Sequence, residues 1–413
     1  STAGTRFASF KIPNGVEVYG GFPANTNRAV LETDIAARDV ITDATILSGD
    51  LDNTNTISSG DAYHVVFTKN TDSTTLIDGF FITGGNANGT TINANGGGFY
   101  NDGNGLNNTS TPLIRNCSIS DNAATEGAGL YNNGNSGTSS PTLVNCIFSN
   151  NTATSGGGLY NNGDNGVSSP TLVNCTFSSN SATNGGGLYN NGINSGTSNP
   201  TVRNTIFWAN TGNSWFNNAA NTDVAYTLVS ESGTATITTG DYAGTTAGLG
   251  MIYATDPLFT NAVSGTFTLQ SNSPAIDAGS SAAVEITTDI TGNPRVRDCE
   301  VDLGAFESVS AAIPEVSVTV SPVQIAEDNG GTTINFTFNT SRVGCTNLRV
   351  SFSVSGTATY NEDYYLIRGA NIFTATGGEI AIPAGQTSAT LVLQVQQDAI
   401  FEADETIVIA ITD

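Results

Sequence analysis

SPTLVNCIFSNNTATSGGGLYNNG, from Ser140 to Gly163, is repeated almost unchanged as SPTLVNCTFSSNSATNGGGLYNNG from Ser169 to Gly192. A looser copy, TPLIRNCSISDNAATEGAGLYNNG, runs from Thr111 to Gly134. Equivalent positions such as Cys117 and Cys146 are 29 residues apart. Self-similarity at a fixed period of this length is typical of a solenoid, a propeller or an array, in which each repeat forms one supersecondary unit.

Aligning the copies separates inward from outward positions. Three positions at short alternating spacing are apolar or small, and a fourth, directly after the first of them, also accepts charge. Alternation over short runs bounded by Asn and Gly is typical of strands. The three inward positions are held by Ile77, Ile114, Leu143, Leu172 and Val202; by Phe80, Cys117, Cys146, Cys175 and Thr205; and by Ile82, Ile119, Phe148, Phe177 and Phe207, and the outward position by Asp78, Arg115, Val144, Val173 and Arg203.

These patterns select one kind of repeat. No apolar stripe with the 3.6-residue period of a helix occurs, which excludes helical repeats. A propeller blade needs about 40 residues and four antiparallel strands, more than one repeat provides. We therefore expect a parallel β-helix in which one repeat forms one coil and the coils stack about 4.8 Å apart.

Asparagine and cysteine also recur in register. Asparagine tolerates left-handed backbone and can hydrogen-bond along a stack, so its recurrence predicts bends with amide ladders. Cysteines at one inward position have parallel Cβ directions, which suit a disulfide poorly, so we expect buried reduced thiols there. The pairing of Cys299 with Cys345 stays open. The asparagine series are Asn116, Asn145, Asn174 and Asn204, and Asn122, Asn151, Asn180 and Asn210.

Segments on both sides of the repeats carry a family resemblance. They are SFKIPNGVEVYGGF (9–22), TILSGDLDN (45–53) and TLIDGFFITGGNANG (75–89) upstream, and DPLFTN (256–261), FTLQSNSPAIDAG (267–279) and DITGNPRVRDCEVDLGAFE (289–307) downstream. Together with the repeats they resemble the pectin-lyase-like, right-handed parallel β-helices of bacterial surface proteins with a closing module of the choice-of-anchor type. The resemblance implies that residues 1–310 form such a β-helix with its closing module.

After Ala311 the sequence changes to longer alternating strands separated by turn signals, such as TINFTF (333–338) and ATLVLQVQ (389–396). This pattern predicts an antiparallel β-sandwich over residues 311–413. The stretches AEDNGG (326–331), GTATYNEDYY (356–365) and DAIFEADETIVIAI (398–411) resemble a Calx-β domain. The matched stretch stops before that family's final strand, so we expect the last strand to be absent from this sequence.

The Calx-β resemblance implies a Ca²⁺ site in the sandwich. Carried over by position, its ligands are Glu327, Asp363, Asp398 and Glu402, with the Ile400 carbonyl as a further candidate. Hard cations require six to eight oxygen ligands, and these acids lie in loops between predicted strands. Solvated acidic loops are the alternative interpretation. Ca²⁺ is the one cofactor that the sequence suggests.

Composition narrows the function. The 413-residue chain has 36 acidic and 12 basic residues and a net charge of −24. That balance excludes phosphate-backbone recognition, and therefore nucleic acid as a partner. It fits an extracellular protein whose carboxylates meet divalent cations. No run of 18 apolar residues is present, so we expect no membrane-spanning segment.

Catalysis by the β-helix needs residues that the sequence does not supply in the right pattern. Arg115 and Arg203, outward and three coils apart, lack a repeated acidic cluster between them. Asn221-Thr222-Asp223 matches part of a galacturonase pattern whose other elements are missing. His64 has no Ser or Cys partner in the pattern, so we assign no catalytic residue. The outward tyrosines Tyr100, Tyr131, Tyr160 and Tyr189 form a candidate face for a glycan or a partner, with mutual stacking as the alternative.

The sequence thus predicts a non-catalytic, secreted structural or adhesive protein of a bacterial surface, filament or matrix, with a Ca²⁺-stabilised C-terminal domain. The alternative is a carbohydrate-binding or polysaccharide-cleaving β-helix. Candidate partners are further copies of the same chain joined head to tail, other surface proteins, and glycans.

Overall fold

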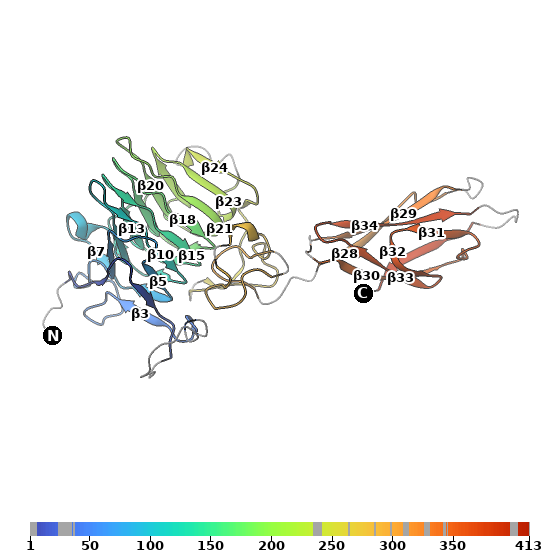
Figure 1. Cartoon of the computed structure of the whole chain (residues 1–413), viewed down its shortest axis with the longest axis horizontal. Helices are drawn as coiled ribbons and strands as arrows, with labels where there is room; N and C mark the ends of the chain where they lie inside the picture. Colours follow the sequence, from blue (N-terminus) through green and yellow to red (C-terminus); the bar gives the residue numbers. More distant parts are fainter. Residues whose placement is uncertain are drawn as a thin grey trace. The chain divides into compact units, whose positions relative to one another are not determined.

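The computed structural model describes residues 6–23, 35, 38–233, 242–262, 265–284, 286–297, 300–308, 314–325, 331–341, 344, 346–396 and 404–412. The chain divides into two compact units, residues 1–310 and 311–413, and each is treated separately below. Every sheet of the stacked coils in the first unit is parallel, whereas the second unit is antiparallel (Figure 1). The prediction of an all-β chain, a parallel β-helix followed by antiparallel sheets, is therefore confirmed.

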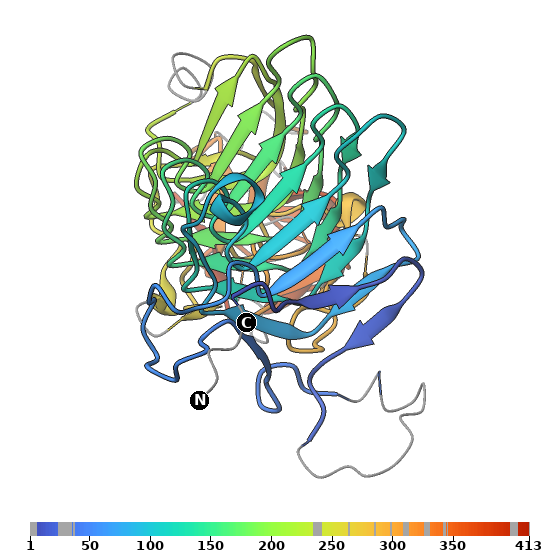
Figure 2. The same ribbon diagram turned by 90° about the vertical axis from the view of Figure 1, so that its left-hand side faces the viewer.

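One parallel sheet of the first unit runs the length of the stack (Figure 2). Each strand pairs in register with its neighbour one coil away, so that Leu130 lies opposite Leu159 and Leu159 opposite Leu188. The strands, in spatial order, are β1 (Phe10–Ile12), β4 (Val66–Lys69), β8 (Phe99–Asp102), β13 (Leu130–Asn133), β17 (Leu159–Asn162), β20 (Leu188–Asn191) and β22 (Trp215–Asn218).

The other long parallel sheet consists of two stacks of strands that a bend separates in each coil. The two stacks become continuous in the longer strands β21 (Thr201–Trp208) and β23 (Thr222–Val229), and β24 (Thr245–Ala247) and β25 (Ile252–Tyr253) pair with β23. The first stack contains β2 (Glu17–Tyr19), β5 (Leu76–Asp78), β10 (Leu113–Arg115), β15 (Thr142–Val144) and β18 (Thr171–Val173), and the second β3 (Thr45–Ser48), β6 (Phe80–Thr83), β11 (Ser118–Ser120), β16 (Ile147–Ser149) and β19 (Thr176–Ser178).

Short elements complete the coils. Two-residue parallel pairs join neighbouring coils at the corners. They are β7 (Asn86–Ala87) with β12 (Ala123–Ala124) and β9 (Thr109–Ser110) with β14 (Thr138–Ser139), and the 3₁₀ helix η1 (Thr91–Ala94) lies beside them in the chain. The described part of the chain contains no helix with the length and apolar character that a membrane crossing requires.

The bend between the two stacks has a local cause. Asn116, Asn145, Asn174 and Asn204 all adopt left-handed backbone, with φ between 50° and 54°. Asparagine reaches this conformation at lower cost than other non-glycine side chains, so the recurring Asn sets the bend in these four coils. The predicted role of this asparagine series is confirmed.

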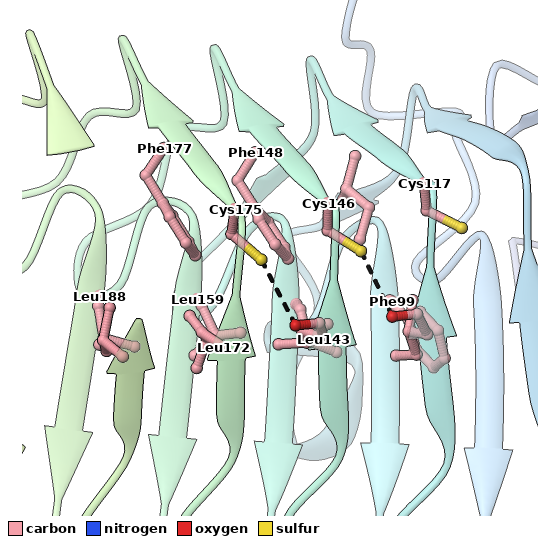
Figure 3. Packing of buried hydrophobic residues seen from close by; sticks show 14 of the residues in the cluster. Phe99, Cys117, Leu143, Cys146, Phe148, Leu159, Leu172, Cys175, Phe177 and Leu188 are labelled. Atoms are coloured by element: carbon pink, nitrogen blue, oxygen red, sulfur yellow. Dashed lines mark hydrogen bonds between the residues drawn. The ribbon is translucent and has the colours of Figure 1, made fainter. Parts of the chain in front are cut away.

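The predicted inward positions line the core of the β-helix (Figure 3). Cys117, Cys146 and Cys175 are fully buried free thiols, and each Sγ lies near a main-chain carbonyl, as Cys175 does at 3.6 Å from Leu143 O. Burial raises the pKa of the Cys117 thiol to about 12, which disfavours its reactive thiolate form. The reduced thiol series is confirmed, whereas Cys299 and Cys345 lie outside the described residues.

The predicted outward position points away from the core but is buried in several coils. Asp78, Val144 and Val173 are at most 2% exposed, although they point away from the core. Asp78 is covered by Arg38 and Arg115, both ion-paired to its carboxylate, and by the Asn116 amide at 2.9 Å. The predicted outward direction of this position therefore holds, and its burial comes from other side chains that cover it.

The described part of residues 256–308, called the closing module below, lies against the outer face of the coils. Its short elements are β26 (Phe259–Asn261), β27 (Thr266–Leu269) and the 3₁₀ helix η4 (Ser281–Ala283). Ile147, Ile206 and Leu228, on outward faces of the coils, form a second core with Phe259 and Phe267 of the module. Hydrogen bonds also fix the contact, such as the one that Ala305 N donates to the Thr176 side-chain Oγ1 at 3.1 Å.

The second unit contains two antiparallel four-stranded sheets in its described part. Phe336, Phe338 and Leu391 from one sheet share a buried core with Phe352 and Ile380 from the other. The predicted sandwich arises because the apolar positions of each strand alternate onto this inner face. One sheet is β28 (Val316–Ser321), β29 (Thr333–Thr340), β34 (Ser388–Val395) and β31 (Tyr364–Arg368), and the other β32 (Ala370–Thr374), β33 (Gly377–Ile382), β30 (Leu348–Gly356) and β35 (Ile407–Ile411).

Candidate functional sites

The tyrosine series forms a continuous aromatic stack. Tyr100, Tyr131, Tyr160 and Tyr189 occupy equivalent positions of β8, β13, β17 and β20. Neighbouring rings are stacked, with centroids 5.2 Å apart between Tyr100 and Tyr131 and 4.6 Å apart between Tyr160 and Tyr189. Phe67 and Phe216 extend the stack at its two ends. Each ring therefore buries the apolar face of its neighbour.

These tyrosines are not an open strip. Tyr100, Tyr131 and Tyr160 are 3–6% exposed, and Tyr189 is partly buried. The loop before each strand turns at a glycine in left-handed backbone, and Gly127 and Gly156 contact the following tyrosine so closely that a Cβ would lie about 3 Å from it. Of the two interpretations left open by the sequence, this geometry matches mutual stacking. It offers a planar ligand no exposed ring face on the three inner tyrosines.

The residues weighed for catalysis are engaged elsewhere. Arg115 Nε lies 2.6 Å from Asp78 Oδ2, and Arg203 Nη2 lies 2.6 Å from Asp223 Oδ2. His64 is buried, its Nδ1 lies 3.0 Å from Gly96 O, and burial lowers its pKa. Each group therefore has a structural partner where it lies.

One acidic cluster follows strand β3. Asp50, Asp52 and Asp61 bring carboxylate oxygens within 4.8 Å of one another, close enough to share a metal ion. Asp52 Oδ2 accepts a 2.7 Å bond from Ser58 Oγ, and Asp61 Oδ2 one of 2.6 Å from Ser58 N. Hydrogen bonds from Ser58 and Thr54 lower the pKa of Asp52, which keeps it ionised. The sequence analysis missed this cluster, although the Asp-x-Asp spacing in TILSGDLDN was its visible signal.

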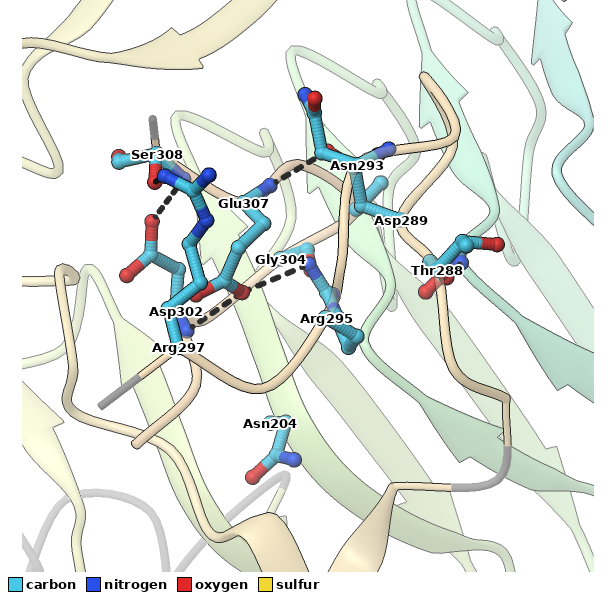
Figure 4. Close-up of polar contacts among 12 residues, drawn as sticks. Asn204, Thr288, Asp289, Asn293, Arg295, Arg297, Asp302, Gly304, Glu307 and Ser308 are labelled. Carbon is cyan, nitrogen blue, oxygen red and sulfur yellow. Dashed lines mark hydrogen bonds and ion pairs between the residues drawn. The ribbon is translucent and has the colours of Figure 1, made fainter. Parts of the chain in front are cut away.

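A second acidic cluster lies in the closing module (Figure 4). Asp277, Asp302 and Glu307 bring carboxylate oxygens within 4.8 Å of one another, and Arg295 is fully buried beside them. Arg295 Nη1 lies 3.4 Å from Glu307 Oε2, and its other amino group donates to Gly304 O. Burial and the neighbouring Asp302 raise the pKa of Glu307 to about 8. This cluster therefore already contains a cation, the guanidinium, which a metal would have to accommodate.

The predicted sandwich site is only partly visible. Glu327, Asp398, Ile400 and Glu402 lie outside the described residues. Asp363 is described, and its Oδ2 accepts a hydrogen bond from Thr359 N at 2.5 Å. It lines a cavity of about 580 Å³ together with Asp404 and Glu405. The structure thus places three acidic residues, including the predicted ligand Asp363, around one cavity.

Comparisons with known proteins are sparse. No protein-family model and no curated protein matches the chain. Among solved structures, the chain has a weak likeness to a tailspike protein gp49 from Acinetobacter baumannii bacteriophage Fri1, described as a capsular polysaccharide depolymerase. The identity is 11%, the TM-score is 0.20, and the match covers 88% of this chain and 68% of that one. A likeness at this level carries no argument about function.

Proposed function

We propose that this chain is a non-catalytic structural or adhesive protein of a bacterial surface, filament or extracellular matrix. One observation carries the proposal: the outward side of the β-helix is used for packing. The tyrosine stack closes one face, and the closing module covers outward Ile147, Ile206 and Leu228 on another. A shaft built in this way is rigid, because each coil is fixed by its neighbours and several coils are also fixed by the module.

The second part of the proposal is a Ca²⁺-stabilised sandwich. Asp363, Asp404 and Glu405 around one cavity support it, because Ca²⁺ prefers several carboxylate oxygens from loops. Glu327, Asp398, Ile400 and Glu402 remain the proposed further ligands from the Calx-β resemblance. Ca²⁺ would there offset the mutual repulsion of acidic loops at one end of the sandwich.

The proposal extends to location and partners. A chain with net charge −24 is suited to a secreted, Ca²⁺-containing environment. Its partners would be further copies of the chain, other surface proteins, or surface glycans held without cleavage.

Incubation with acidic and neutral polysaccharides tests the proposal. We expect retention on some immobilised glycan or surface-protein preparation without new reducing ends and without the ultraviolet absorbance of unsaturated uronates. Turnover that scales with protein concentration would overturn the structural interpretation and favour a polysaccharide-cleaving β-helix. Arg203→Met, which removes an outward cation paired to Asp223, serves as the matched variant for any activity observed.

A further inference from the structure

We propose that Asp50, Asp52 and Asp61 form a Ca²⁺ site that joins the first described coil of the β-helix to the second. The site is separate from the sandwich site proposed above. Its three carboxylates come from one loop between β3 and β4, and their oxygens lie within 4.8 Å of one another. Proximity of acids alone is common, so the proposal requires an independent sign of a ligand.

That sign is the buried carboxylate of Asp61. Its side chain is 0% exposed, and its Oδ1 has no hydrogen-bond partner. An unsatisfied buried carboxylate oxygen is costly because it has lost its water without gaining a partner, and native structures rarely contain one without a ligand. Oδ2 is satisfied by Ser58 N, so the deficit lies on one oxygen of a carboxylate that belongs to the cluster. A cation shared with Asp50 and Asp52 would supply the missing partner.

The nearby Arg6 does not provide the missing partner of the Asp61 carboxylate. Arg6 donates from Nε to the main-chain oxygen of Asp61 at 2.6 Å, and its Nη2 binds Asn86 O and Asn88 Oδ1. Its guanidinium also lies over the Tyr63 ring, 3.9 Å from the centroid. Among the described residues, no ion pair of an Arg or Lys side chain involves Asp50, Asp52 or Asp61. Three acids thus lie together without a cationic side chain between them.

The donor chemistry selects the ion. The ligands are carboxylates, with the hydroxyls of Thr54 and Ser58 hydrogen-bonded to Asp52 beside them. Hard oxygen donors suit Ca²⁺, whose coordination geometry is adaptable, whereas Mg²⁺ demands stricter octahedral geometry. The cluster consists of carboxylates and contains neither His nor Cys, which disfavours zinc.

The position explains what the ion would do. β3 is the terminal strand of its sheet and pairs only with β6 of the next coil, so its other edge is unpaired in the described structure. After β3 the chain passes through the loop and enters the second coil, where Ala62 N binds Gly49 O at 2.9 Å. An ion held by residues 50, 52 and 61 would cross-link the two ends of this loop and stabilise the edge coil of the solenoid.

The test is hydrogen–deuterium exchange of the full chain with and without Ca²⁺, combined with calorimetric titration by Ca²⁺. We expect Ca²⁺ to slow exchange at least threefold in peptides covering residues 48–62, with Mg²⁺ weaker. Asp52→Asn removes an exposed ligand without disturbing the core. It should weaken Ca²⁺ binding at this site at least tenfold. Asp121→Asn is the matched control, because Asn150 occupies the equivalent left-handed position one coil on.

The outcomes separate the two proposed calcium sites. Protection confined to peptides of residues 311–413, unchanged by Asp52→Asn, would support the sandwich site and overturn this one. Protection of residues 48–62 that Asp52→Asn removes, with the sandwich unaffected, would support this site alone. Equal loss of protection in Asp121→Asn would show a general charge effect and also overturn it.

Discussion

The stacked coils and the closing module both bury polar groups, but they satisfy them differently. In the coils, neutral amides repeat: Asn132 Nδ2 donates to Asn161 Oδ1 at 2.9 Å, and Asn161 Nδ2 donates to Asn190 Oδ1 at 2.8 Å. In the module, Arg295 is buried with Glu307 and Asp302 in one charged cluster that does not repeat. A repeated neutral ladder distributes the desolvation cost of its amides over many coils, and these amides do not titrate. A single charged cluster concentrates both the desolvation cost and the pH sensitivity in one place.

The charged cluster should be the more fragile of the two. At pH values above about 8, where Glu307 is ionised, Arg295→Met leaves this buried carboxylate without its counter-charge, and removing one partner of a buried pair typically costs about 3–5 kcal/mol. Peptides from residues 256–307 should then exchange hydrogen much faster, while coils 111–191 stay protected. Adding Glu307→Gln should recover part of the loss, because the remaining acceptor is then neutral. Additive effects of the two substitutions in urea unfolding would show that the pair is not coupled.

A break in the neutral ladder should cost less. Asn161→Ala removes two buried hydrogen bonds and leaves the Asn132 donor and the Asn190 acceptor unpaired, a loss of about 2–3 kcal/mol. Because the ladder repeats, Asn132→Ala should cost nearly the same. Thr154→Ala, at an exposed position in the same coil region, should change the unfolding free energy by less than about 0.5 kcal/mol. Unequal costs in adjacent coils would argue against a uniform ladder.

The pH dependence of stability should also distinguish the two regions. The pKa of Glu307 is about 8 in the folded chain, against 4.5 as its ordinary value. Between these values the folded chain holds a proton that the unfolded chain has released, so this group's contribution falls as pH rises from about 4.5 to 8. Glu307→Gln should therefore lose less stability than the wild type over this window, in melts followed by circular dichroism. Parallel melting curves for both proteins would contradict a raised pKa.

The contrast also marks what sequence could predict. The 29-residue repeat carries its own register, so the inward positions and the left-handed Asn bends follow from the alignment alone. Docking of the module does not repeat, and its contacts, such as Ala305 N with Thr176 Oγ1, join residues 129 positions apart. The Asp61 carboxylate is likewise brought to Asp50 and Asp52 by the path of a loop. Neither periodicity nor composition predicts such non-repeating contacts, so the burial of outward Val144 could not be predicted from the repeat.

The smallest predicted effect lies in the tyrosine stack, where the hydroxyls of Tyr100 and Tyr131 accept bonds from Asn133 and Asn162. Tyr131 Oη accepts a 2.9 Å bond from Asn162 Nδ2, and a side-chain hydrogen bond with Tyr131 partly offsets the rise that burial causes in the pKa of Glu126. Tyr131→Phe should therefore cost about 1 kcal/mol, and more at pH values where Glu126 is ionised. Tyr160→Phe, which keeps the same stacking without a comparable pair in the described structure, should be nearly neutral. Equal costs in urea unfolding would mean that packing of the rings, and not their hydroxyls, sets the stability of this face.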